Sequence, residues 1–254
     1  MQPIGLIAAM NQERDALLRR VKGARRIKLG PFRGYSFDLH GQACVLVTSG
    51  MGMRRAGEAT RCLVEAKGPR LLISFGIAGA VESDLEIGDV VAAGSVCLLL
   101  GGIPDLFQPL AAWPGASTRA MISILAGGGA HLYPGTALTT AGSQLMPGRP
   151  VGLNHPVLEM ETAGIARVAA ENDIPLLSIR AISDGPRAPI PLNLDEMMDQ
   201  DANLKVGKLL KAVIRHPGIL AHTRQLMVNT QLAADNAARA LVAALDGMAS
   251  SEVN

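Results

Sequence analysis

Four acidic residues stand at the ends of predicted strands or the starts of predicted helices, where side chains of an α/β sheet usually meet a ligand. Asp184 ends the segment RAISD, directly after the apolar run at 176–179. Glu159 and Glu161 open a predicted helix, and Glu13 falls in the first turn after the N-terminal strand. Carboxyl groups become useful acids or bases when burial or a neighbouring charge shifts their pKa. Asp184 is therefore the leading candidate for a catalytic acid.

The stretch from 158 to 184 predicts a helix followed by a strand. Apolar residues recur at helical spacing over 160–169, and Glu159 and Glu161 lie in the predicted first turn, where the helix dipole favours negative charge. Pro175 prevents a return to helix, so the apolar residues that follow are predicted as a strand buried on both faces. The strand would carry Asp184 to the end of the sheet.

Glu13 has two interpretations from its local sequence. A glutamate in the first turn of a helix complements the helix dipole on the protein surface, and the sequence pattern alone favours that position. The alternative is a functional side chain, because turns between strand and helix line the ligand clefts of α/β sheets.

Two glycine-rich segments follow predicted strands. The segment SGMG at 49–52 resembles half of a dinucleotide fingerprint, but Arg55 stands where the third glycine belongs, which makes a nicotinamide cofactor a weak interpretation. A loop that approaches a small ligand or an anion is favoured there. The segment GIAGA at 76–80 predicts either a plain tight turn or main chain lying against a ligand after the strand at 71–75.

The composition limits the classes of protein to consider. The 254 residues include 3% aromatic residues and carry a net charge of +2 with acids and bases interspersed. This suits one α/β domain with a large core and argues against a nucleic-acid surface. Cys44, Cys62 and Cys97 lack metal-ligand spacing, so we expect reduced thiols and no metal site. With no signal-peptide pattern and no apolar run of about 18 residues, we expect a cytoplasmic protein.

Apolar runs and turn residues predict the remaining elements. They are a hairpin of 35–39 and 44–48, a helix ending near 67, strands at 87–97 and 135–140, a helix at 117–125, a loop at 146–155, and helices at 199–215 and 219–245. The last helix is amphipathic and is predicted to pack on the domain or on another subunit. It carries too few basic and aromatic residues for a membrane-surface helix.

With these pieces in order, the chain resembles the superfamily of nucleoside phosphorylases and nucleosidases over nearly its full length. The matching motifs are IGLIAAMNQE, SGMG, SFGIAGA, IGDVV, LEMETAGIA and RAISD, in the order of the family. The resemblance is nearest to the hopanoid-associated branch, in the SFGIAG string and in a proline-interrupted C-terminal tail. It implies a single domain over 1–254 with a central mixed twisted sheet flanked by helices, and a helical extension at about 199–247.

The resemblance also implies roles for the acidic residues. Asp184 would donate a proton to N7 of the departing purine, with Ser183 positioning its carboxyl group. Glu161 would bind the ribose hydroxyls, Met160 would pack under the sugar, and Glu159 would lie close by.

Other positions line the implied cleft. Ile77, Ala78 and Gly79 would present main chain to the ligand, and Ser143 and Gln144 stand where family members often carry an aromatic residue that stacks on the base. No cofactor is implied, and the expected partners are a small nucleoside and further copies of the chain.

Water is the expected second reactant. The resemblance gives Glu13 the role of activating water, and Ser74 and Ile77 stand where phosphorylases carry arginine and serine. A phosphate 4 Å from Glu13 would be repelled by about 4 kcal/mol at intermediate dielectric. Phosphorolysis is the alternative, in which phosphate is a co-substrate and an arginine such as Arg14, Arg54 or Arg55 binds it. A non-catalytic purine-nucleoside binder is the second alternative.

Overall fold

The computed structural model describes residues 2–100, 103–140, 152–186 and 219–252, which form ten strands and five helices. The strands are β1 (Ile4–Ala8), β2 (Arg25–Leu29), β3 (Phe32–Leu39), β4 (Gln42–Thr48), β5 (Leu71–Ala80), β6 (Val90–Leu100), β7 (Ile103–Pro109), β8 (Leu132–Thr140), β9 (Pro156–Glu159) and β10 (Leu176–Asp184). The helices are α1 (Asn11–Leu18), α2 (Met53–Lys67), α3 (Gly115–Ala126), α4 (Thr162–Glu171) and α7 (Ile219–Glu252).

The strands form one mixed sheet, part of which closes on itself. Five strands pair in a ring: β5 with β9, β9 with β8, β8 with β6, β6 with β10, and β10 with β5. From β5 the sheet continues through β1, β4, β3 and β2, while β7 pairs with β6. The predicted mixed α/β sheet is thereby confirmed. Because β5 belongs to both the ring and the open part, its end lies next to several other strand ends.

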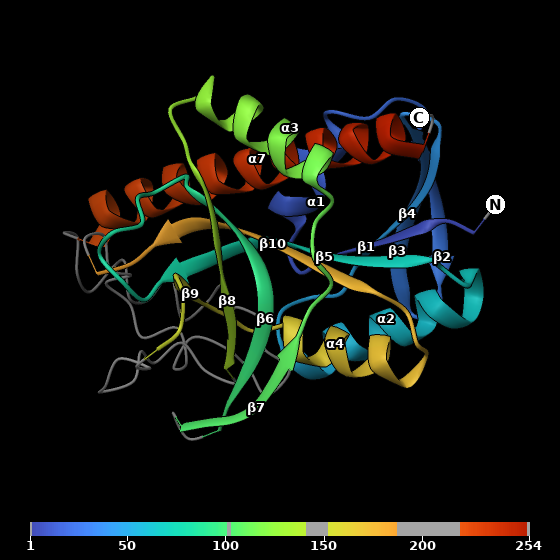
Figure 1. The fold of residues 1–254 in the computed structure, drawn as a ribbon, viewed down its shortest axis with the longest axis horizontal. Coiled ribbons are helices and arrows are strands. Elements are labelled where there is room, and N and C mark those ends of the chain that lie inside the picture. The colour runs from blue at the N-terminus through green and yellow to red at the C-terminus, as the bar shows by residue number, and fades with distance from the viewer. Residues whose placement is uncertain (1, 101–102, 141–151, 187–218, 253–254) are drawn as a thin grey trace.

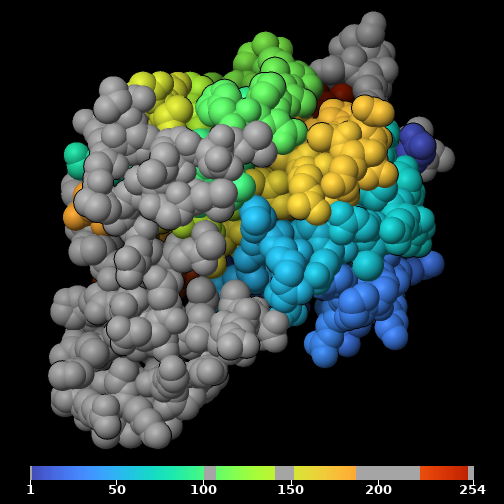
Figure 2. All heavy atoms as spheres, turned by 90° about the horizontal axis from the view of Figure 1, so that it is seen from below, coloured from blue at the N-terminus to red at the C-terminus, as the bar shows by residue number. Residues whose placement is uncertain are grey.

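Helices cover both faces of the sheet (Figure 1). Helices α1, α3 and α7 lie on one face, and α2 and α4 lie side by side on the other, where Figure 2 shows them together at the surface. Helix α7 contacts α1, α3, β5 and β10. Its buried face is rich in alanine, which lets the helix approach its neighbours closely. The residues of that face are Ala233, Ala234, Ala237, Ala238, Ala240, Leu241, Ala244 and Leu245.

Most predicted elements appear close to their expected bounds. The hairpin, the helix ending at Lys67, and the strands that end at Thr140 and Asp184 are confirmed. The predicted packing of the last helix on the protein core is confirmed as well. Among the described helices, none is both long and apolar enough to cross a membrane. The predicted helix at 199–215 and the loop at 146–151 lie outside the described residues.

Near the glutamate and glycine motifs, one prediction is wrong and one of two open interpretations is excluded. Helix α4 begins at Thr162, not Glu159, because residues 156–159 pair with β5 and β8 as strand β9. Glu159 is therefore the last residue of a strand. The segment at 76–80 is not a turn, because β5 continues through it and pairs with β9 and β10. Strands β2 and β7 were not predicted, since both lie at the sheet margin and carry weak apolar patterns.

Candidate active site

The register of three strands brings the predicted site residues together. Gly79 of β5 lies opposite Asp184 of β10 on one side and opposite Leu158 of β9 on the other. The chain from Glu159 to Glu161 follows Leu158 directly, so both acidic segments meet at the end of β5. This arrangement depends on a register shift in β10 between Ile182 and Asp184.

Asp184 is partly buried and lies against the main chain of β5. Its Oδ1 accepts a hydrogen bond of 2.6 Å from Ser183 Oγ. A Cβ placed on Gly79 would lie 2.8 Å from Asp184 Oδ2, so the glycine lets the carboxyl group lie in this position without being displaced. Burial raises the pKa of Asp184, while the hydrogen bond from Ser183 opposes that rise. The pair thus has the geometry of an acid held by a neighbouring hydroxyl.

Glu13 is buried, with 3% of its surface exposed, so the surface position that its local sequence favours is wrong. Its Oε2 accepts a hydrogen bond from the N–H of Met10 at 2.8 Å, and its Oε1 accepts one from the N–H of Ile77 at 3.0 Å. A Cβ on Gly76 would overlap its carboxylate. Burial raises the pKa of Glu13 despite these donors. Glu13 and Asp184 are therefore seated at two glycines of β5 that are three residues apart.

Glu159 is the centre of a buried hydrogen-bond network. Its Oε2 accepts hydrogen bonds from the N–H of Glu161 at 3.0 Å, the N–H of Thr162 at 2.8 Å and the hydroxyl of Thr162 at 2.7 Å. Arg180 Nη2 donates to the same oxygen at 2.8 Å, and Thr139 Oγ1 donates to Oε1. Burial disfavours the charge, but Arg180 and the hydroxyl donors outweigh it and lower the pKa of Glu159.

Glu161 lies beside the loop that carries SGMG. Its Oε1 accepts a hydrogen bond of 2.8 Å from the N–H of Gly52. We predicted that this loop approaches a ligand or an anion, and in the structure the loop contacts the protein's own carboxyl group. Burial, and next the negative charge of Glu159, raise the pKa of Glu161 to about 8. Glu161 therefore holds its proton over much of the neutral range.

Arg180 is a buried residue of the site that the motif analysis did not single out. It is 2% exposed, and its Nη2 donates to Ser74 Oγ at 2.7 Å and to Thr162 Oγ1 at 2.8 Å, besides Glu159. The sequence does contain an indication of its importance, because Arg180 stands inside an otherwise apolar strand and a buried arginine needs an acidic partner. Three glutamates surround its charge, because Glu159, Glu161 and Glu13 all act on it.

The remaining predicted site residues fall into two groups. Met160 and Ile77 are partly buried, and Ala78 is buried within β5. Ser143 and Gln144 lie outside the described residues. Within the described part of the chain, no group of three or more His, Cys, Asp or Glu residues could hold a metal ion.

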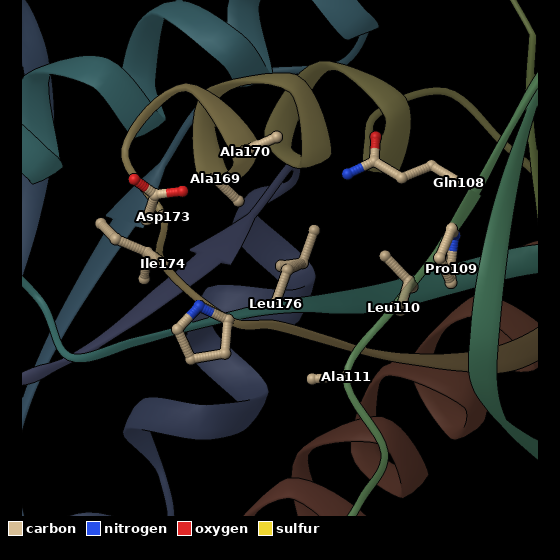
Figure 3. A pocket seen from close by; sticks show the side chains of 10 residues that line it. Gln108, Pro109, Leu110, Ala111, Ala169, Ala170, Asp173, Ile174 and Leu176 are labelled. Atoms are coloured by element: carbon tan, nitrogen blue, oxygen red, sulfur yellow. The ribbon is translucent and has the colours of Figure 1, made fainter.

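A surface depression of about 390 Å³ lies elsewhere, between the C-terminal end of α4 and the chain that follows β7 (Figure 3). Gln108 and Asp173 provide its polar groups among apolar neighbours such as Leu110 and Ile174. None of the four predicted acidic residues lines it. The site is therefore defined by the convergence of carboxyl groups at the end of β5 rather than by this depression.

The fold and the site define an α/β protein with buried acids gathered at the carboxyl ends of its central strands. The chain belongs to the phosphorylase superfamily, whose family model matches residues 3–215. This confirms the family that the sequence motifs indicated.

Individual relatives agree with this membership. A 5′-methylthioadenosine/S-adenosylhomocysteine nucleosidase of Listeria innocua is 28% identical over 231 residues, which cover 83% of this chain and 99% of that protein. The nucleosidase of the same name from Colwellia psychrerythraea, solved in complex with adenine, superposes with a TM-score of 0.72 at 19% identity and covers 97% of this chain and 95% of its own. Futalosine hydrolase of Helicobacter pylori gives 0.69 at 18% identity, covering 96% and 97%. The two structures establish the fold.

Proposed function

We propose that this chain is a nucleosidase that cleaves the N-ribosyl bond of a 5′-modified adenosine with water and releases the base. The observation that carries the proposal is the seating of two carboxyl groups, Asp184 and Glu13, against glycines of one strand, with Glu161 close enough to Glu13 for their charges to interact. The names of the relatives, which are hydrolytic purine nucleosidases, support the same reaction.

Asp184 is the proposed general acid. Breaking an N-ribosyl bond leaves negative charge on the base, and a proton delivered to the purine at N7 neutralises it. Burial raises the pKa of Asp184, which favours the protonated form that a general acid needs. Ser183 holds the carboxyl group by the hydrogen bond to Oδ1, which leaves Oδ2 available to the base.

The sugar is the proposed ligand of Glu161 and Met160. Positive charge develops on the ribose ring as the bond breaks, so an oxygen acceptor at the hydroxyls stabilises the transition state. Glu161 has only the Gly52 N–H as a side-chain hydrogen-bond partner within the described residues, so its second oxygen remains available. Ile77, Ala78 and Gly79 would then present main chain to the nucleoside from the end of β5.

Glu13 is the proposed base that activates water. Its burial next to the N–H of Ile77 provides an acceptor that cannot be approached by phosphate without strong repulsion. The arginines that a phosphorylase would need are engaged: Arg14 pairs with Asp15, Arg54 pairs with Glu58, and Arg55 donates to the carbonyl of Ser49. These contacts favour hydrolysis over the alternative of phosphorolysis.

The finer features of the substrate are also part of the proposal. The relatives favour a methylthio or homocysteinyl group at the 5′ position, and the resemblance to the hopanoid-associated branch favours a lipid-linked adenosine. Ser143 and Gln144 are proposed to contact the base. We further propose assembly of the chain into a cytoplasmic homo-oligomer. A purine-nucleoside binder without activity is the less favoured alternative, because binding alone does not require three acids, two buried and one partly buried, with raised pKa values.

The test measures base release from methylthioadenosine, adenosylhomocysteine, inosine and a lipid-linked adenosine, with and without phosphate. We expect adenine release that does not need phosphate. Asp184→Asn keeps an oxygen for the Ser183 hydroxyl and should lose about 10² to 10⁴ in turnover. Asp173→Asn is the matched control, because Asp173 is exposed and asparagine accepts its positive φ of 54°. Full activity of Asp184→Asn, or binding of adenosines without base release, would overturn the proposal.

A further inference from the structure

We propose that Glu159 is a positioning residue: it contacts no substrate, and its carboxylate fixes the start of α4 and the guanidinium of Arg180 so that Glu161 is held at the ribose. The proposal rests on the nucleosidase function proposed above and changes the role that the sequence motif gave to Glu159. It is carried by the hydrogen-bond network around the two glutamates.

Both oxygens of the Glu159 carboxylate are engaged by buried donors of the protein. Oε2 accepts hydrogen bonds from the N–H of Glu161, the N–H and hydroxyl of Thr162, and Arg180 Nη2. Oε1 accepts one from the hydroxyl of Thr139. Its side chain is 0% exposed. A ribose hydroxyl at this carboxylate would have to displace one of these buried partners.

Glu161 differs from Glu159 in this respect although it lies only two residues away. Within the described residues, its carboxyl group accepts a single hydrogen bond, from the N–H of Gly52. The N–H of Glu161 is itself bound to Glu159 Oε2. One glutamate thus fixes the main chain that carries the other, and of the two, within the part of the chain that the structure describes, only Glu161 has a carboxyl oxygen without a hydrogen-bond partner.

The five donors come from β8, β10 and the start of α4. The relative positions of these elements determine where the carboxyl group of Glu161 lies. Thr139 lies near the C-terminal end of β8. Its hydroxyl donates a hydrogen bond to Glu159 and accepts one of 2.9 Å from the N–H of Ala163. Thr162 contributes from the first turn of α4, and Arg180 from β10. Glu159 therefore joins β8, β10 and α4 at the end of β9.

Glu159 also sets the electrostatic surroundings of Glu161. The groups that act on Glu161 are Glu159 from β9, Arg180 from β10 and Glu13 from α1, while α2 contributes the N–H of Gly52 at its start. Burial raises the pKa of Glu161 most, and the charge of Glu159 raises it further. Removing that charge while keeping the shape of the side chain should lower the pKa of Glu161.

The first experiment is Glu159→Gln, which retains an amide oxygen for the donors of α4 and Arg180. The proposal predicts that KM for methylthioadenosine rises about tenfold or more while kcat changes less. It also predicts that the pH at which kcat/KM is half-maximal moves to lower pH, because Glu161 ionises more easily without the charge of Glu159. A side chain that only stabilises the fold would lower activity without moving that pH. An unmoved pH profile in a folded Glu159→Gln variant would overturn the proposal.

Thr139 provides a second test that does not depend on the folding of Glu159→Gln. Thr139→Val removes one donor to Glu159 and the acceptor for Ala163, and should raise KM, whereas Thr139→Ser should restore it. Thr136→Val is the matched control, since Thr136 is buried on the same strand but its hydroxyl pairs with Ser95 at 3.1 Å. Equal KM values for Thr139→Val and Thr136→Val would contradict the proposal.

These outcomes are separate from a failure of the proposed function. If the wild-type chain releases no base from any nucleoside, the nucleosidase proposal fails. If the wild-type chain is active and the variants keep the wild-type KM and pH profile, only the role of Glu159 fails.

Discussion

A single methyl group at Gly79 should slow catalysis with little effect on folding. The Cβ of Gly79→Ala would lie 2.8 Å from Asp184 Oδ2, whereas ordinary contacts begin near 3.4 Å. The carboxyl oxygen therefore has to move by roughly 0.6 Å or more, which the end of a side chain does at low cost. A misplacement of about 1 Å at a catalytic group costs up to about 10²-fold in rate. We expect kcat/KM for methylthioadenosine to fall about 10- to 100-fold.

The assay compares adenine release and thermal unfolding for Gly79→Ala and a matched control. Gly94→Ala also adds a methyl group to a strand glycine, but its Cβ would meet no heavy atom within 4 Å, and its φ lies outside the left-handed region. Replacing such a glycine restricts the unfolded chain and stabilises a protein by about 0.4–1 kcal/mol. Gly94→Ala should therefore keep full activity and melt at or slightly above the wild-type temperature.

The reasoning would be refuted by a folded Gly79→Ala variant with wild-type kcat/KM. That result would mean that Asp184 does not need its place against β5 to act. A loss of activity shared equally by Gly94→Ala would refute it as well, since the loss would then not arise from contact with Asp184.

Three further perturbations have defined outcomes. Gly76→Ala places a Cβ 2.8 Å from Glu13 Cδ, and because two N–H donors hold this buried carboxylate, both melting temperature and kcat/KM should fall. Glu161→Gln should raise the melting temperature relative to wild type at pH 9 and leave it nearly unchanged at pH 5. The reason is that a pKa raised from 4.5 to about 8 gives wild type a stability that is fully present below pH 4.5 and is lost as pH rises through 8. At about 1.36 kcal/mol per pKa unit the loss is up to about 5 kcal/mol, or roughly 10–20 °C by calorimetry. Gly164→Ala brings a Cβ to 2.9 Å from the carbonyl carbon of Met53, so it should separate α2 from α4 and cost about 1–3 kcal/mol in urea unfolding.

Local sequence patterns were sufficient to predict strand β10 and the position of Asp184 at its end. The apolar run after Pro175 is long enough to identify a buried strand, and Asp184 stands at its end, as predicted. The same reasoning predicted α7, because its apolar residues recur at helical spacing over many turns.

Local patterns failed where distant residues decide the structure. Glu159 lies in a strand of four residues that exists through pairing with β5 and β8, and no local period reveals a strand so short. Glu13 was favoured as a surface residue because its partner Ile77 is 64 positions away. Arg180 received no role because Glu159, its buried partner, is separated from it by 21 positions. In each case a contact distant in sequence overrides the local preference.

The most direct test of the central claim is the identity of the sugar product formed from methylthioadenosine in buffer that contains phosphate. We expect adenine and free methylthioribose, at a rate that phosphate does not change, because Glu13 is proposed to activate water and its carboxylate would repel a phosphate. Formation of methylthioribose 1-phosphate as the main product would contradict the account and assign the chain to phosphorolysis.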